Sequence, residues 1–158
     1  MIVLKTATES DIDFICACEA EEESARYIRP WPREWHVAAL ADSDCASLII
    51  YTAHNLERVG MILLFGFASP DRSIELRRIV CARRGAGIGR AAIKAVKKMA
   101  FEQMSSHRLW LDVKSKNTRA RHLYQSEGFI EEGVMRECLL DGDGFESLIL
   151  MSILQSEL

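Results

Sequence analysis

A glycine-rich segment at residues 83–90, with the sequence RRGAGIGR, is the feature that most constrains this chain. Residues 74–81 before it are rich in Ile, Val and Leu and indicate a strand. After it, apolar side chains recur every three or four positions from Ile88 to Met99, which predicts a helix. The segment therefore connects a strand to the N-terminus of a helix.

The glycines of this segment, Gly85, Gly87 and Gly89, alternate with Ala86 and Ile88. Because glycine has no Cβ atom, several backbone N–H groups of the loop can turn toward one ligand. The helix dipole favours a negative ligand at the same place. The sequence therefore predicts an anion site with phosphate as its natural occupant. The alternative is a loop that only caps the helix.

Two common phosphate-binding patterns do not fit this loop. The dinucleotide fingerprint G-x-G-x-x-G fails at Arg90, and no acidic residue follows a strand about 20 residues later. The P-loop pattern G-x-x-x-x-G-K-[ST] is absent. The loop therefore indicates a phosphate-containing ligand of another kind.

Charge is strongly segregated along the 158 residues, although the formal net charge is only −3. Residues 6–25 carry seven acidic side chains and no basic one, whereas residues 77–98 carry eight basic side chains and no acidic one. A net acidic chain argues against a dedicated nucleic-acid-binding protein. The basic block fits one small polyanion bound near the glycine loop, and a solvated helix face is the alternative.

The chain is predicted to form one α+β domain over residues 1–158, because it contains no linker, repeat or low-complexity segment. We expect about seven mostly antiparallel strands and about four helices, with a helical crossover after the fourth strand. The predicted helices begin near residues 12, 32, 88 and 117. The predicted strands span residues 2–5, 45–51, 59–67, 74–81, 109–113, 129–134 and 145–151.

The sequence shows no sign of a membrane span, a leader or a metal site. Uncharged runs such as residues 59–70 reach only 12 residues, and Lys5 interrupts the N-terminal segment. The five cysteines lack the spacing of zinc or redox motifs, and the four histidines show no ligand spacing. We therefore expect a cytoplasmic protein with reduced thiols, without a bound metal and without membrane contact.

Two motifs, in this order, resemble those of the GCN5-related N-acetyltransferase (GNAT) superfamily. The first is a pyrophosphate loop, [RQ]-x-x-G-x-[GA], which is matched by Arg84, Gly87 and Gly89. The second is N-x-x-A-x-x-[LF]-Y-x-x-x-G-F, which is matched by Asn117, Ala120, Leu123, Tyr124, Gly128 and Phe129. The resemblance covers residues 74–137 approximately and is to the subgroup that includes the ribosomal-protein N-terminal acetyltransferases.

The resemblance implies a GNAT-like fold and acetyl-coenzyme A as the acetyl donor. Ile79, Val80 and Cys81 would pair with the donor's pantetheine arm as an added strand would. Asn117 would contact that arm or the distal part of the cofactor, and a helix N-cap is its alternative role. Carried over by position, the donor's pyrophosphate would be held by backbone amides of Arg84, Gly85, Ala86, Gly87, Ile88 and Gly89.

Many relatives have a proline or an aliphatic residue near the position of Cys81. We do not expect the Cys81 thiol to act as a covalent nucleophile, because no histidine lies close in sequence and the family transfers the acetyl group directly.

The resemblance also assigns the acid and the base of the reaction. Tyr124 stands at the motif position of the general acid, which protonates the leaving thiolate, and a core tyrosine is the alternative. Glu75 is the candidate base, and strand alternation predicts that it shares a face with Arg77, Ile79 and Cys81. A salt bridge between Glu75 and Arg77 is the alternative for this carboxylate.

We therefore expect an N-acetyltransferase that brings acetyl-coenzyme A and a primary amine together for direct attack. The acceptor is left open between a protein or peptide N-terminus, a polyamine and a small-molecule amine; the acidic residues 6–25 suit a cationic one. A non-catalytic coenzyme A-binding regulatory module and a nucleotide-phosphate enzyme are the alternatives. The sequence does not indicate whether the terminal strands form a homodimer.

Overall fold

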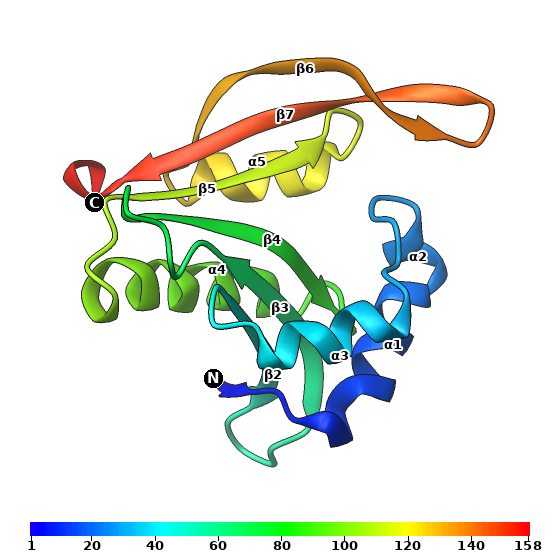
Figure 1. Ribbon diagram of the computed structural model, residues 1–158, viewed down its shortest axis with the longest axis vertical. Coiled ribbons are helices and arrows are strands. Elements are labelled where there is room, and N and C mark those ends of the chain that lie inside the picture. Colours follow the sequence, from blue (N-terminus) through cyan, green and yellow to red (C-terminus); the bar gives the residue numbers. More distant parts are fainter.

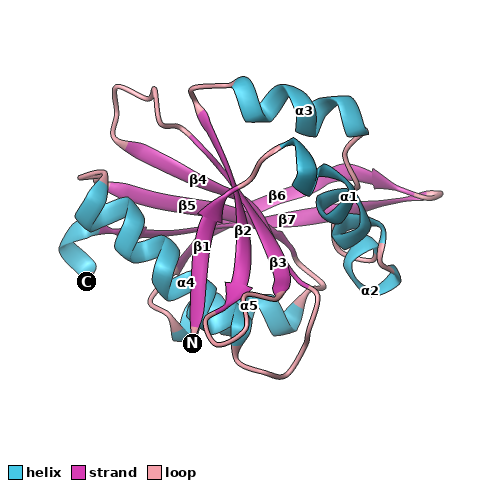
Figure 2. Cartoon of the chain, turned by 90° about the horizontal axis from the view of Figure 1, so that it is seen from below, coloured by secondary structure: helices cyan, strands magenta, loops and turns pink.

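The computed structural model describes residues 1–158 as a seven-stranded sheet with helices on both of its faces (Figures 1 and 2). The strands are β1 Ile2–Thr6, β2 Cys45–Thr52, β3 Arg58–Phe65, β4 Ser73–Cys81, β5 Arg108–Lys114, β6 Ile130–Asp141 and β7 Gly144–Leu154. The helices are α1 Ile12–Ala20, α2 Glu22–Ala25, α3 Arg33–Ala41, α4 Ile88–Lys98 and α5 Thr118–Ser126. Short turns of other helical types are η1 Glu9–Asp11, η2 Met99–Gln103 and η3 Gln155–Glu157.

The α+β architecture and the seven expected strands are confirmed, and the helices number five, because the four-residue helix α2 lies in a polar stretch without apolar periodicity. The sheet order is β1-β2-β3-β4-β5-β7-β6. Every neighbouring pair is antiparallel except β4 and β5, which run parallel. Helix α4 lies between these two strands in the chain, so it forms the predicted crossover.

Two apolar clusters fill the two sides of the sheet. The larger one contains 21 buried residues and includes the apolar stripe of α4, with Ala92, Ile93 and Val96. The smaller one contains nine buried residues, among them Ile12 and Ile15 of α1. Figure 2 shows α1 and α3 over one face of the sheet and α4 and α5 over the other. The 3.6-residue periodicity of α4 thus places its apolar face on the sheet.

The sheet opens between β4 and β5. These strands pair only through Ser73 with Arg108, Ile74 with Leu109 and Glu75 with Trp110. Beyond Glu75 no β4 residue pairs with β5, whereas β4 stays paired with β3 as far as Cys81. One edge of β4 is therefore free of a neighbouring strand in its second half, and a gap opens there between the two halves of the sheet.

A β-bulge interrupts β4 at the start of this gap. Leu63 of β3 lies opposite Arg78 and Leu64 lies opposite Leu76, so Arg77 is one residue in excess. Leu76 before the bulge and Ile79 after it both pack on the larger cluster, although strict alternation would place them on opposite faces. The prediction that Glu75 shares a face with Ile79 and Cys81 is therefore wrong, because the extra residue reverses the alternation.

Candidate active site

A cavity of about 1090 Å³ occupies the gap between β4 and β5. It is lined by the second half of β4, the glycine loop, the first turns of α4, the end of β5, helix α5, the segment from α2 to Pro30 and the end of β6. Since the gap passes between the two halves of the sheet, the cavity is bounded by helices from both faces. Two substrates entering from different sides can therefore meet beside β4.

The glycine loop forms one wall of this cavity. Gly85 and Gly87 have φ values of 76° and 74°, which an L-residue rarely adopts, and a Cβ atom at either position would meet no atom within 4 Å. Packing therefore does not require these glycines. Gly87 is the N-cap of α4 and caps it with no side chain, and the N–H groups of Ile88, Gly89 and Arg90 have no partner. The loop thus presents free N–H donors at a helix N-terminus, as an anion site requires.

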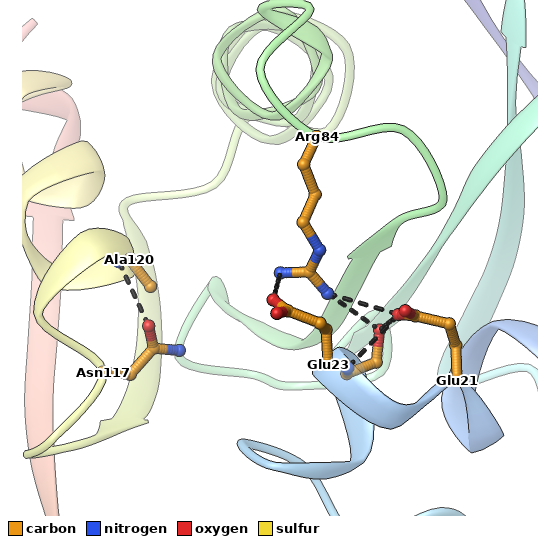
Figure 3. Close-up of polar contacts among 6 residues, drawn as sticks. Glu21, Glu23, Arg84, Asn117 and Ala120 are labelled. Carbon is orange, nitrogen blue, oxygen red and sulfur yellow. Dashed lines mark hydrogen bonds and ion pairs between the residues drawn. The ribbon is translucent and has the colours of Figure 1, made fainter.

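Arg84 belongs to this loop, and its side chain makes contact with the segment around α2 (Figure 3). Its guanidinium is 3.3 Å from a carboxylate oxygen of Glu21 and 3.4 Å from one of Glu23, and it donates to Ser24 Oγ at 3.4 Å. Arg119 of α5 also lines the cavity and forms no ion pair. A polyanion at the α4 N-terminus would therefore meet one guanidinium already shared with carboxylates and one that is free.

The free edge of β4 forms the floor of the cavity through Ile79, Val80 and Cys81. An extended chain can add to such an edge through main-chain hydrogen bonds. Burial raises the pKa of the Cys81 thiol to about 11, so the thiol stays protonated at neutral pH and is a poor nucleophile.

Asn117 is the N-cap of α5. Its Oδ1 accepts a hydrogen bond from the N–H of Ala120 at 3.3 Å (Figure 3). The cap role is therefore present, and the same residue also lines the cavity. Both roles considered from the sequence are compatible with this position.

Tyr124 lies on α5 with its ring against Phe129, at 5.7 Å between ring centroids. The side chain is buried and lines the cavity. Its hydroxyl makes no hydrogen bond to protein. Only two side-chain polar atoms are both fully buried and without a partner, His36 Nδ1 and Arg78 Nε, and the Tyr124 hydroxyl is not one of them. The hydroxyl oxygen therefore keeps accessible surface. Burial is the main cause that raises the pKa of Tyr124, and the nearby Cys81 and Asp112 raise it further, so the phenol stays protonated.

Glu75 does not line the cavity. Both of its carboxylate oxygens accept hydrogen bonds from Arg77, each at 2.6 Å, in a bidentate salt bridge. This geometry supports the ion-pair alternative for Glu75 and gives no support to its assignment as the base. The bulge is the physical reason, because it turns Glu75 away from the face that carries Ile79 and Cys81.

Asp112 of β5 is a cavity carboxylate that the sequence reasoning missed. It is exposed, lines the cavity and forms neither an ion pair nor a side-chain hydrogen bond. The surrounding walls desolvate the carboxylate, and the negative charge of Glu75 adds to this, so the pKa of Asp112 is raised. A signal was available in the sequence, because Asp112 is the one acidic residue inside the predicted strand 109–113.

The chain belongs to the acetyltransferase (GNAT) family, whose model matches residues 14–129. It is 30% identical over 100 residues to a spermidine N(1)-acetyltransferase of Vibrio cholerae serotype O1, an alignment that covers 63% of this chain and 58% of that protein. It is 28% identical over 103 residues to the spermidine N(1)-acetyltransferase of Escherichia coli K12, covering 64% and 55%. The chain therefore matches less than two thirds of the length of these relatives.

Solved structures of the same kind show the same fold. A spermidine N-acetyltransferase from Vibrio cholerae in complex with CoA and spermine matches with a TM-score of 0.89 at 24% identity, over 99% of this chain and 96% of that one. A chimera of the Vibrio cholerae enzyme and hSSAT matches with a TM-score of 0.88 at 25% identity, over 98% and 96%. These relatives are named for spermidine, so they do not support the expected likeness to ribosomal-protein N-terminal acetyltransferases.

No group of three or more His, Cys, Asp or Glu side chains is placed to hold a metal ion. No helix of the structure has the length and apolar character that a bilayer crossing requires.

Proposed function

We propose that this protein transfers the acetyl group of acetyl-coenzyme A to a primary amine. The observation that carries the proposal is the cavity itself, in which free N–H donors at the α4 N-terminus, a free β4 edge, a protonated tyrosine and an unpaired carboxylate surround one gap. Family membership supports the same activity. A module that only bound coenzyme A would need neither Tyr124 nor Asp112 in the wall of this cavity.

The donor would lie between α4 and α5. The N–H groups of Ile88, Gly89 and Arg90 would donate to its pyrophosphate, where the α4 dipole adds favourable charge. Its pantetheine arm would run along Ile79–Cys81, whose free edge supplies main-chain donors and acceptors. Arg119 is a further free cation for its phosphates. This arrangement would leave the thioester in the gap near Tyr124.

Asp112 is the base of the proposed reaction, in place of Glu75. An amine arrives as an ammonium ion and has to lose a proton before its lone pair can attack the thioester carbonyl carbon. A carboxylate with a raised pKa is a better proton acceptor near neutral pH than an ordinary one. As the C–N bond forms and the C–S bond breaks, the Tyr124 phenol donates its proton to the departing thiolate.

Polyamines are the first acceptors to test, because the relatives are named as spermidine acetyltransferases. The purified protein would be incubated with acetyl-coenzyme A and a panel of amines, and free thiol release would be followed. We expect amine-dependent thiol release that falls about 100-fold or more in the Asp112→Asn and Tyr124→Phe variants, with unchanged donor affinity.

A protein that binds coenzyme A but releases no thiol with any amine would contradict the proposal and favour the regulatory module. Preferential binding of ATP in a competition titration would instead favour the nucleotide-phosphate enzyme. Full activity of Tyr124→Phe would contradict the acid assignment alone.

A further inference from the structure

The acceptor half of the cavity contains many charges, but most are already paired. Arg77 is bound by Glu75, Arg78 by Glu19 and Lys114 by Asp141 at 2.9 Å. Of the carboxylates that line the cavity, Glu23 is shared with Arg84. Asp112 is the one carboxylate lining the cavity that has no partner. An acceptor with a single ammonium group therefore finds a partner, and further ammonium groups do not.

Arg29 is the cation on this wall without a carboxylate partner. It lies in the segment between α2 and α3, is exposed and lines the cavity. Its Nη2 donates to the backbone carbonyl of Leu140 at 2.7 Å, and its other nitrogens make no hydrogen bond. The contact with β6 holds the guanidinium at the cavity wall while most of its donors stay free.

Arg78 lies near this segment, and its guanidinium is bound by a buried network of Glu19 and His36. Glu19 and His36 are completely buried, with 2.6 Å between Glu19 Oε1 and His36 Nε2, and Glu19 also accepts from Arg78 Nη1 and from the Trp31 N–H. The Trp31 ring lies over the guanidinium at 5.6 Å. Although burial opposes it, the hydrogen bond from His36 and the charge of Arg78 lower the pKa of Glu19, so this carboxylate stays ionised.

The Arg78 side chain is 9% exposed and lines the cavity, and its donors are not all used. Nη1 donates to Glu19, whereas Nε is fully buried without a partner. Nη2 has no partner either and is not among the fully buried atoms, so it keeps accessible surface. A buried, rigidly held guanidinium with unused donors indicates a ligand oxygen.

We infer that the acceptor carries a carboxylate in addition to its amine, and that Arg29 and Arg78 bind this carboxylate while Asp112 receives the amine. The inference rests on the proposed acetyltransferase activity and names its acceptor class, an amino-acid-like amine. It differs from what the names of the relatives suggest. A polyamine would bring two or three ammonium groups to a wall that has one free carboxylate and a free guanidinium.

The test compares acceptors of equal chain length that differ only in the far group. At each of several lengths, the panel contains an ω-amino acid, the alkylamine and the diamine, for example 4-aminobutanoate, butylamine and 1,4-diaminobutane, with spermidine added. We expect kcat/KM for the best ω-amino acid to exceed that of its matched alkylamine about tenfold or more, with the diamine below both.

Two variants test whether Arg29 and Arg78 cause the preference for the ω-amino acid. Arg29→Gln, at an exposed position, and Arg78→Lys, which keeps a charge beside Glu19, would each raise KM for the ω-amino acid about tenfold more than KM for the matched alkylamine. Arg26→Gln is the matched control, because this exposed arginine has no ion pair and lies outside the cavity. We expect it to change neither value.

Higher kcat/KM for spermidine or the diamines would overturn the inference and leave the acetyltransferase proposal intact. A carboxylate preference that persists in both variants would overturn the assignment to Arg29 and Arg78. Absence of thiol release with every acceptor would overturn the proposed function itself.

Discussion

Glu75 and Asp112 are carboxylates on neighbouring strands whose surroundings give them different properties. Glu75 is nearly buried and held by both arms of the Arg77 guanidinium. Asp112 faces the cavity without a partner and has a raised pKa. Both are acidic residues inside a strand. The neighbour that each side chain meets decides which one can accept a proton.

The substitution Glu75→Gln tests which of the two carboxylates is the base. Burial and the charge of Glu75 raise the pKa of Asp112, and Arg77 lowers it. Removing Glu75 removes one negative charge and frees Arg77, so both changes lower the pKa of Asp112. A base works only when deprotonated, so we expect the acidic limb of the kcat/KM profile to move to lower pH, with activity retained at neutral pH.

A loss of about 100-fold or more at every pH in Glu75→Gln would show instead that Glu75 is the base. Circular dichroism and thermal unfolding would establish that the variant is folded.

At the scale of elements, the loop before α4 is built by backbone conformation more than by side chains. Gly87 is both the N-cap of α4 and a left-handed residue with free space around it. An alanine there would fit sterically but would strain the backbone by roughly 1–2 kcal/mol. The loop would relax and turn N–H groups away from the anion site.

We therefore expect Gly87→Ala to weaken coenzyme A binding about tenfold, measured by calorimetry, since each charge-assisted hydrogen bond contributes strongly. The matched control is Gly142→Ala in the β6–β7 turn, where φ is 61° and a Cβ atom would likewise meet nothing within 4 Å. This control has the same backbone strain away from the donor loop. Equal loss of affinity in both variants would contradict the role of the loop.

At the scale of the whole molecule, the gap between β4 and β5 separates two packed halves. The three residue pairs at one end hold the strands together, and the cavity occupies the rest. A donor in the cavity would contact β4 from one half and α5 from the other. Its binding free energy would add to the stability of the folded state, about 2.7 kcal/mol at a concentration 100 times Kd.

We expect coenzyme A to slow amide hydrogen exchange on both sides of the gap, at residues 79–81 and 88–90 and also near residue 117. The reason is that one ligand contacts both walls. Amides of β1, an edge strand three positions away from β4 in the sheet, serve as the internal reference. Protection confined to the α4 side would contradict binding across the gap.

The sequence alone determined the seven strands, the four longer helices, the crossover and the position of the glycine loop. Alternation in the strands, the apolar stripe of α4 and the glycines before it are local features, and local conformational preferences are enough to express them. The motif from Asn117 to Phe129 likewise indicated the family, because its spacing follows helix α5 and the turn after it.

Only the tertiary structure decided which side chains share the site. The bulge at Arg77 reverses the alternation of faces along β4. It depends on the register in which β4 pairs with β3, which neither the residue pattern nor the composition of β4 specifies. The network of Glu19, His36 and Arg78 joins residues up to 59 positions apart. Asp112 became a candidate base because the strands separate beside it. Burial and charge neighbours arise only when distant segments pack, so the roles of the carboxylates are set by the fold.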